Sequence, residues 1–268
     1  MKFILFRHGH SLANQESRIV SSLENGTQTS GGPEGTGFGL SARGKQEVAE
    51  SAQSLLQYVL ASSHPGQRVK VHILTSPFQR TRQTSLIIDS VLRATALDKQ
   101  CPTVLNLHTP LIESKVEIEG EEEPEHVCDL RERFFGDFEM KTPSDELYAQ
   151  VWHEDAKNPF HEIFGVESVA AVTNRMTGVV RDQEAKRKET KKQRRLDTKA
   201  ILQDTATADP EMETEETWIV LVSHGDSLQI LQAAMRGWSG DRHRQVEHLN
   251  TAEWRNVEWC KELAEAHQ

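Results

Sequence analysis

The chain has 268 residues, and its 31 lysines and arginines against 41 aspartates and glutamates give a formal net charge of −10. An acidic chain repels polyanions, so this balance argues against nucleic acid as a partner, although a small anion can bind in a local basic pocket. No apolar run approaches the roughly 18 residues that a membrane span requires, and the N-terminus lacks a signal-peptide core. We therefore expect a cytoplasmic protein without a membrane partner. Its three cysteines are far apart, which predicts reduced thiols and no metal site.

The first half of the chain alternates between strand and helix patterns. Short β-branched or apolar runs predict strands at 2–6, 69–75 and 103–107. Ser41 is a typical cap for a helix that reaches about Val59, and Ser76-Pro77 opens the next helix. This alternation is typical of an α/β fold with a mostly parallel sheet.

The second half adds helix patterns at 143–152 and 168–180, a strand at 217–223 and a final helix after it. We interpret three segments as insertions: a Gly-rich loop at 25–39, an acidic segment at 113–129 and a charged, polar segment at 186–216. Core patterns resume after each of them, so we predict a single domain over 1–268. The basic run at 186–195 contains no aromatic residue, which favours a solvated helix over a nucleic-acid surface.

Two of the predicted strands end in the same turn, because Arg7-His8-Gly9 follows one and Ser223-His224-Gly225 follows the other. Ligands of open α/β sheets bind at the carboxyl ends of the strands. A third strand is followed by Ser76 and Arg80, and an arginine at a helix N-terminus is suited to anions. Each feature alone has an ordinary structural explanation, but together they indicate one basic pocket.

Five blocks in chain order resemble the histidine phosphatase superfamily, whose members are phosphoglycerate mutase-like. The resemblance runs from Phe3 to about Thr251. It is carried by Phe6-Arg7-His8-Gly9-His10-Ser11-Leu12-Ala13-Asn14, Ser76-Pro77 with Arg80 and Thr84, Leu130-Arg131-Glu132-Arg133-Phe134-Phe135-Gly136, Gly165-Val166-Glu167-Ser168, and Val222-Ser223-His224-Gly225.

The resemblance implies a three-layer α/β/α sandwich around a mostly parallel central sheet. It also implies that His8 is the nucleophile, that Glu132 is the general acid and base, and that neither metal nor cofactor is required. The phosphoryl group would be held by Arg7, Asn14, Arg80 and His224, with His224 also counted among the catalytic residues.

The identity of the general acid has an alternative, because Leu111-Ile112-Glu113 fits the same Leu-x-Glu pattern as Leu130-Arg131-Glu132. Glu132 is preferred since the residues that follow it continue the family pattern. Glu167 and the start of the following helix are expected either to order the site or simply to cap that helix.

The expected activity is hydrolysis of a small phosphomonoester through a phosphohistidine intermediate. Phosphoglycerate mutase activity and a non-catalytic binding module of the same fold are the alternatives. The residues after Asn14 lack the aromatic and glycine pattern of the mutases, whereas His224-Gly225-Asp226-Ser227 is closer to the mutase form. A kinase fusion is excluded because the chain has no phosphate-binding loop of the Gly-x-x-x-x-Gly-Lys type. The sequence specifies neither the substrate nor the oligomeric state.

Overall fold

The computed structural model describes residues 1–32, 34–35, 37–63, 68–97, 116–118, 124–204 and 215–260. The predicted strand at 103–107 and the alternative acid Glu113 lie outside these residues. The described strands form one sheet with the order β3-β2-β5-β1-β6, and β4 also pairs with β2. They are β1 (Lys2–Arg7), β2 (Arg68–Thr75), β3 (Val116–Ile118), β4 (Glu125–His126), β5 (Glu215–Ser223) and β6 (Trp254–Val257).

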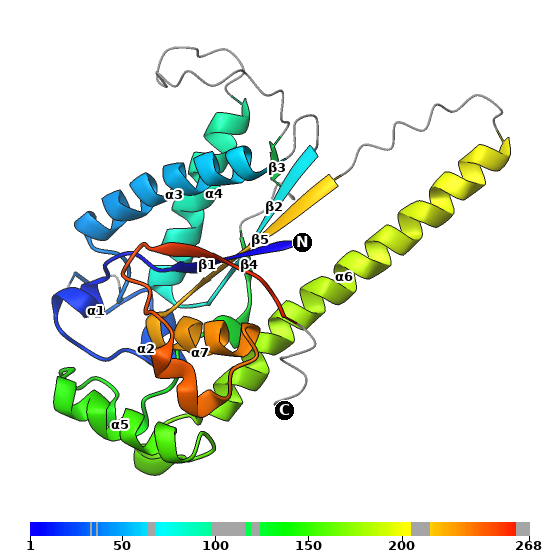
Figure 1. Cartoon of the computed structure of the whole chain (residues 1–268). Coiled ribbons are helices and arrows are strands. Elements are labelled where there is room, and N and C mark those ends of the chain that lie inside the picture. The colour runs from blue at the N-terminus through cyan, green and yellow to red at the C-terminus, as the bar shows by residue number, and fades with distance from the viewer. Residues whose placement is uncertain are drawn as a thin grey trace.

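Helices cover both faces of this sheet (Figure 1). They are α1 (Leu12–Gln15), α2 (Leu23–Thr27), α3 (Ala42–Ser62), α4 (Gln79–Leu97), α5 (Asp145–Lys157), α6 (Val169–Asp204) and α7 (Gly225–Met235). Short 3₁₀ turns occur at η1 (Cys128–Leu130), η2 (Gly136–Phe138), η3 (Ile163–Gly165) and η4 (Gly240–Gln245). The three-layer α/β/α arrangement expected from the sequence is confirmed.

The layers follow from the alternation of side chains along each strand. Ile4 and Phe6 of β1 pack with α3 and α4 on one face, and Phe3 and Leu5 pack with α6 and α7 on the other. All four side chains are at most 2% exposed. Because the central strands are buried on both faces, they read in the sequence as continuous apolar runs.

β1, β2 and β5 lie side by side and parallel, with β5 between the other two. In their register Arg7 pairs with Ser223, and Thr75 pairs with Val222. The three strands therefore end at the same level of the sheet. β6 is antiparallel to β1 and closes one edge, although no strand was expected there from the sequence.

The three expected insertions differ from structureless loops where the structure describes them. The first includes part of α2, whose N-cap is Ser22 and whose Asn25 donates to the distant Glu139 carboxylate. The second contributes β3 and β4, which pair with β2. These contacts join positions far apart in the sequence, so local composition does not reveal them.

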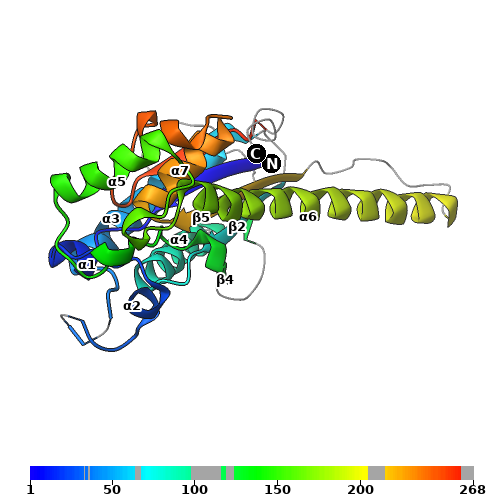
Figure 2. The ribbon, with the colours of Figure 1, turned by 90° about the horizontal axis from the view of Figure 1, so that it is seen from below.

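The third expected insertion begins inside α6, a single helix of 36 residues. Its last core residues are Val179 and Val180, and the side chain of Lys186 is 63% exposed. Figure 2 shows the rest of α6 extending well beyond the body of the molecule. The charged run 186–195 is thus helical, as its composition predicted. No helix in the described ranges is long and apolar enough to span a membrane.

Candidate active site

The parallel register brings three turns together at one edge of the sheet. His8 follows β1, Ser76 follows β2 and His224 follows β5. The ring centroids of His8 and His224 are 5.2 Å apart with the rings edge to face. The two His-Gly turns of the sequence therefore place His8 and His224 next to each other at this edge of the sheet.

The His8 ring is held in one tautomer. Its Nδ1 donates to the Gly9 carbonyl oxygen at 2.8 Å, and its Nε2 accepts from Arg80 Nε at 3.1 Å. His8 is only 4% exposed. Burial lowers the pKa of His8 well below its ordinary value, and the positive charges of Arg80 and Arg7 lower it further. The ring is consequently neutral and carries its lone pair on Nε2, which is the state that a nitrogen nucleophile requires.

The turn that carries His8 is fixed from two helices. On α4, Thr84 Oγ1 accepts the Gly9 N–H at 3.3 Å and donates to the Arg80 carbonyl at 2.7 Å. On α3, the N-terminus approaches the turn so closely that a Cβ at Gly44 would meet the His10 backbone. Thr84, which the sequence placed in the resemblance without a role, thus links the arginine helix to the nucleophile turn.

Both predicted arginines are anchored at one end. Arg80 Nη2 donates to the Val20 carbonyl at 2.8 Å, and Arg7 Nη1 donates to the Leu249 carbonyl at 2.7 Å. Arg7 Nη1 also contacts His248 Nε2 at 2.9 Å. Burial lowers the pKa of Arg80 to about 10, so its guanidinium stays charged at neutral pH.

Three nitrogen atoms of this site are buried and lack a hydrogen-bond partner within the described part of the chain. They are Arg7 Nε, Arg80 Nη1 and His224 Nδ1. Buried donors in proteins are nearly always paired, so such a group indicates a place for an acceptor ligand. Two guanidinium donors make an oxyanion the acceptor with the best match.

His224 is fully buried and is the N-cap residue of α7. Its Nε2 lies 2.8 Å from Ser76 Oγ, and its ring contacts Phe78 at a centroid distance of 4.8 Å. Burial, followed by the charge of Arg80, lowers the pKa of His224 well below its ordinary value. When the Ser76 hydroxyl donates to Nε2, the ring proton of His224 lies on Nδ1, where it is available to an oxyanion.

Glu132 follows η1 and is held by the first turn of α7. Its Oε1 accepts from Ser227 N at 3.2 Å, from Ser227 Oγ at 3.0 Å and from Arg133 N at 2.9 Å. Burial raises the pKa of Glu132, the neighbouring Asp226 carboxylate raises it further, and Arg80 opposes both effects. A carboxyl group with a raised pKa is suited to general acid catalysis near neutral pH.

The segment that carries Glu132 is tied to α6 by the Glu167–Arg175 pair. Arg175 Nε and Nη2 donate to the two Glu167 oxygens at 2.8 and 2.9 Å. Arg175 Nη1 also donates to the backbone carbonyls of Asp129 and Arg131 at 2.6 and 2.9 Å. Of the two roles left open for Glu167, its carboxylate does order this segment.

Asn14 is held by the start of its own helix. Its side chain is exposed, and its Oδ1 accepts from the backbone N–H and hydroxyl of Ser11 at 3.0 and 2.8 Å in a capping box of α1. Within the described ranges no hydrogen bond or ion pair joins it to the two histidines or arginines. Its amide nitrogen is the side-chain group that can donate to a ligand, since the oxygen is an acceptor.

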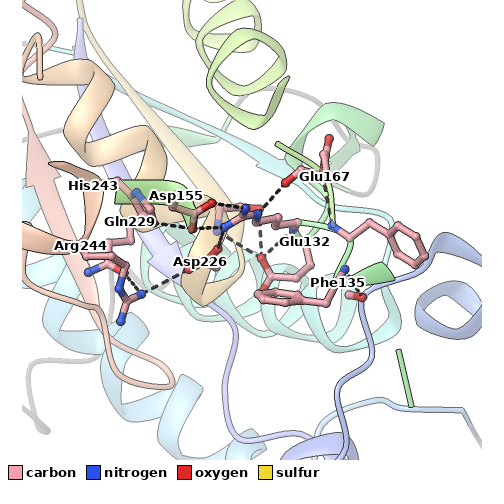
Figure 3. Close-up of polar contacts among 12 residues, drawn as sticks. Glu132, Phe135, Asp155, Glu167, Asp226, Gln229, His243 and Arg244 are labelled. Atoms are coloured by element: carbon pink, nitrogen blue, oxygen red, sulfur yellow. Dashed lines mark hydrogen bonds and ion pairs between the residues drawn. The ribbon is translucent and has the colours of Figure 1, made fainter. Parts of the chain in front are cut away.

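Several residues of the site had no role in the sequence-based prediction. His248 contacts Arg7, Ser76 contacts His224, and Asp226 lies close to Glu132. Figure 3 shows Asp226 between Glu132 and Arg244, with Asp155 beside it. Asp226 follows the second His-Gly turn in the sequence His224-Gly225-Asp226-Ser227. This position near His224 was the feature of the sequence that could have drawn attention to it.

Scans against protein-family models and against curated proteins found no match. Solved structures do match. A structure described as mycobacterial hydrolase 1 is 19% identical with a TM-score of 0.54, covering 95% of this chain and 87% of its own. A mycobacterial glucosyl-3-phosphoglycerate phosphatase complexed with VO₃ is 17% identical with a TM-score of 0.56, covering 98% and 93%. Mycobacterial hydrolase 2 is 17% identical with a TM-score of 0.51, covering 95% and 80%.

These similarities extend over nearly the whole chain and concern the fold. The chain therefore shares its overall fold with these solved structures, and this fold is the α/β sandwich that its sequence blocks predicted.

Proposed function

We propose that the chain is a phosphatase that hydrolyses a small phosphomonoester through a phosphohistidine formed on His8. The observation that carries the proposal is the neutral, buried His8 together with three buried nitrogen atoms that have no hydrogen-bond partner among the described residues, Arg7 Nε, Arg80 Nη1 and His224 Nδ1. A phosphoryl group in transfer has three nonbridging oxygens, which matches this set of donors. The likeness in fold to a phosphatase whose structure contains VO₃ supports the same class of ligand.

In the first step His8 Nε2 attacks phosphorus, and the bond between phosphorus and the leaving oxygen breaks. Arg80 Nε, which donates to Nε2 in the free protein, must release it and turn to the phosphoryl oxygens. The leaving oxygen takes the proton of the Glu132 carboxyl. Positioned arginines contribute about 10³ to 10⁵ in rate in phosphoryl transfer, and a general acid about 10² to 10⁴.

In the second step a water molecule attacks the phosphorus of phosphohistidine. Glu132, now a carboxylate, takes the proton of that water, and the phosphorus–nitrogen bond breaks with its electron pair returning to Nε2. The product is inorganic phosphate, and both His8 and Glu132 return to their starting states. The raised pKa of Glu132 suits it to this exchange of roles.

The proposal is tested with purified protein, an aryl phosphate and a chelator in the assay. We expect wild-type turnover, and we expect His8→Ala to lower kcat by at least about 10³-fold because the nucleophile is lost. His153→Ala is the matched control, since His153 is exposed on α5 and should be fully active. A wild-type protein that is inert toward a broad panel of phosphomonoesters, yet converts 3- to 2-phosphoglycerate, would contradict the proposal and favour a mutase.

A further inference from the structure

Directly behind Glu132 lies a buried cluster of charges that the proposed mechanism does not use. The Arg133 side chain is 0% exposed, and its Nη2 and Nη1 donate to the two Asp155 oxygens at 2.7 and 2.8 Å. Arg133 Nη1 also contacts Asp226 Oδ2 at 3.2 Å. Figure 3 shows Asp155, Asp226 and His243 gathered on the side of Glu132 away from Glu167. Because two carboxylates contact its guanidinium, the Arg133 side chain is held firmly in place.

Asp226 joins this cluster to the active site. It lies in the first turn of α7, two residues after His224, and the next residue is the Ser227 that donates to Glu132. The same helical turn therefore holds Glu132 through Ser227 and holds the adjacent Arg133 through Asp226. Two contacts therefore join α7 to the segment of Glu132: Arg133 with Asp226, 93 residues apart in the sequence, and Glu132 with Ser227, 95 residues apart.

We propose that Asp226 is a positioning residue of the phosphatase: together with Arg133 it fixes the Glu132 carboxyl at the pocket and keeps it protonated until the leaving group takes the proton. The proposal rests on the proposed function and adds a residue to its acid–base step. Asp226 acts through Glu132 and is not assigned a contact with the substrate.

The charges around Glu132 support this role. The groups that face it are Asp226 on α7, Arg80 on α4, Arg7 at the end of β1 and Tyr148 on α5. Asp226 raises the pKa of Glu132, whereas Arg80 lowers it. Burial is the main cause of the raised pKa of Glu132, and Asp226 supplies the negative charge that adds to it and opposes Arg80.

Asp226 must itself stay ionised to have this effect. Arg133, then His243 and Arg244, overcome the effect of burial and lower the pKa of Asp226. Its position in the first turn of α7 also favours a negative charge, because the positive end of the helix dipole lies there. The cluster therefore shifts the pKa values of two neighbouring carboxyl groups in opposite directions.

The experiment compares wild type with Asp226→Asn on two substrates: an aryl phosphate with a good leaving group and an alkyl phosphate with a poor one. Asparagine keeps the shape and can accept from Arg133, but it removes the charge. We expect the high-pH limb of kcat/KM, where Glu132 loses its proton, to move down by about one pH unit. Above that limb, alkyl phosphate turnover should fall about tenfold, while the aryl phosphate should change less than about threefold because its leaving group needs little protonation.

A second variant covers the case in which Asp226→Asn does not fold. Arg244 donates to Asp226 Oδ1 at 3.3 Å, and its side chain is 30% exposed. Arg244→Gln leaves Asp226 less neutralised, so the same limb should move to higher pH. Asp145→Asn is the matched control, since Asp145 is an exposed aspartate in the first turn of α5 and should not move the limb.

The outcomes separate this inference from the proposed function. If wild type is active and depends on His8, but both variants keep the wild-type limb, the inference is overturned and the phosphatase proposal stands. Equal losses on both substrates with an unmoved limb also overturn it, because they indicate a structural role alone. Inactivity of wild type on both substrates overturns the inference together with the proposed function.

Discussion

At the residue scale, the candidate site depends on histidines that the fold keeps neutral. His8 and His224 are buried among arginines, so the pKa of each lies well below the ordinary value of 6.5. A neutral His8 is nucleophilic, but the same burial makes the folded protein sensitive to acid. The unfolded chain binds protons at both positions as the pH falls below 6.5, whereas the folded chain does not.

This difference predicts that stability decreases between pH 6.5 and 5.5. Each of the two histidines should lower the free energy of unfolding by up to about 1.4 kcal/mol per pH unit in this window. Urea unfolding at a series of pH values measures the slope, and His8→Asn should make it shallower. His153→Ala removes an exposed histidine and should keep the wild-type slope. An equally steep slope in His8→Asn would show that His8 does not titrate differently on unfolding.

At the element scale, the site is built where α3 meets the turn after β1. Gly9 and Gly44 face each other, and a Cβ on Gly9 would lie 2.6 Å from the Gly44 carbonyl oxygen. Glycine is required at both positions because the two backbones lie close together, and not because of a positive φ angle. A side chain at either position would push α3 away from the turn that carries His8.

We therefore expect Gly44→Ala to destabilise the protein by about 1 to 3 kcal/mol, which is typical of overpacking, and to lower phosphatase activity as the His8 turn shifts. Thermal unfolding and kcat/KM measure the two effects. Gly178→Ala in α6 is the matched control, because a Cβ there meets nothing within 4 Å. That control should stabilise by up to about 1 kcal/mol through helix propensity. Equal stability of the two variants would disprove the close approach.

At the scale of the whole molecule, α6 reaches far beyond the sandwich while the site lies at the carboxyl ends of the strands (Figures 1 and 2). The charges of Arg187, Lys191 and Glu216 all act on the amino group of Met1. The outgoing helix and the returning β5 thus pass close to the same point of the body. The chain therefore leaves the body of the molecule along α6 and returns to it along β5 at nearly the same place.

From this geometry we expect that residues 192–212 can be replaced by a linker of about six glycines and serines, which spans roughly 12 to 15 Å. Phosphatase kcat and KM should stay within about twofold of wild type, because the last residues of α6 in the core cluster are Val179 and Val180 within the described part of the chain. Loss of turnover in a variant with an unchanged circular dichroism spectrum would show that the projecting helix contributes to the site.

Much of this organisation could be predicted from the sequence. The apolar runs of β1, β2 and β5, the helix cap at Ser41 and the repeated His-Gly turns are local signals, and they were enough for the sandwich and for a pocket containing His8 and His224. The strand β6 and the anchoring of α2 were missed. Their partners lie at the other end of the chain or more than 100 residues away.

The sequence by itself determined which residue types stand at the ends of the central strands, because a parallel sheet with aligned strands leaves its turns at one edge. Only the tertiary structure decided their chemical states. The tautomer of His8 depends on Gly9 and Arg80, and the raised pKa of Glu132 depends on burial and then on Asp226. Such states arise from burial and from charges brought together across the chain, and neither quantity is a property of a local sequence pattern.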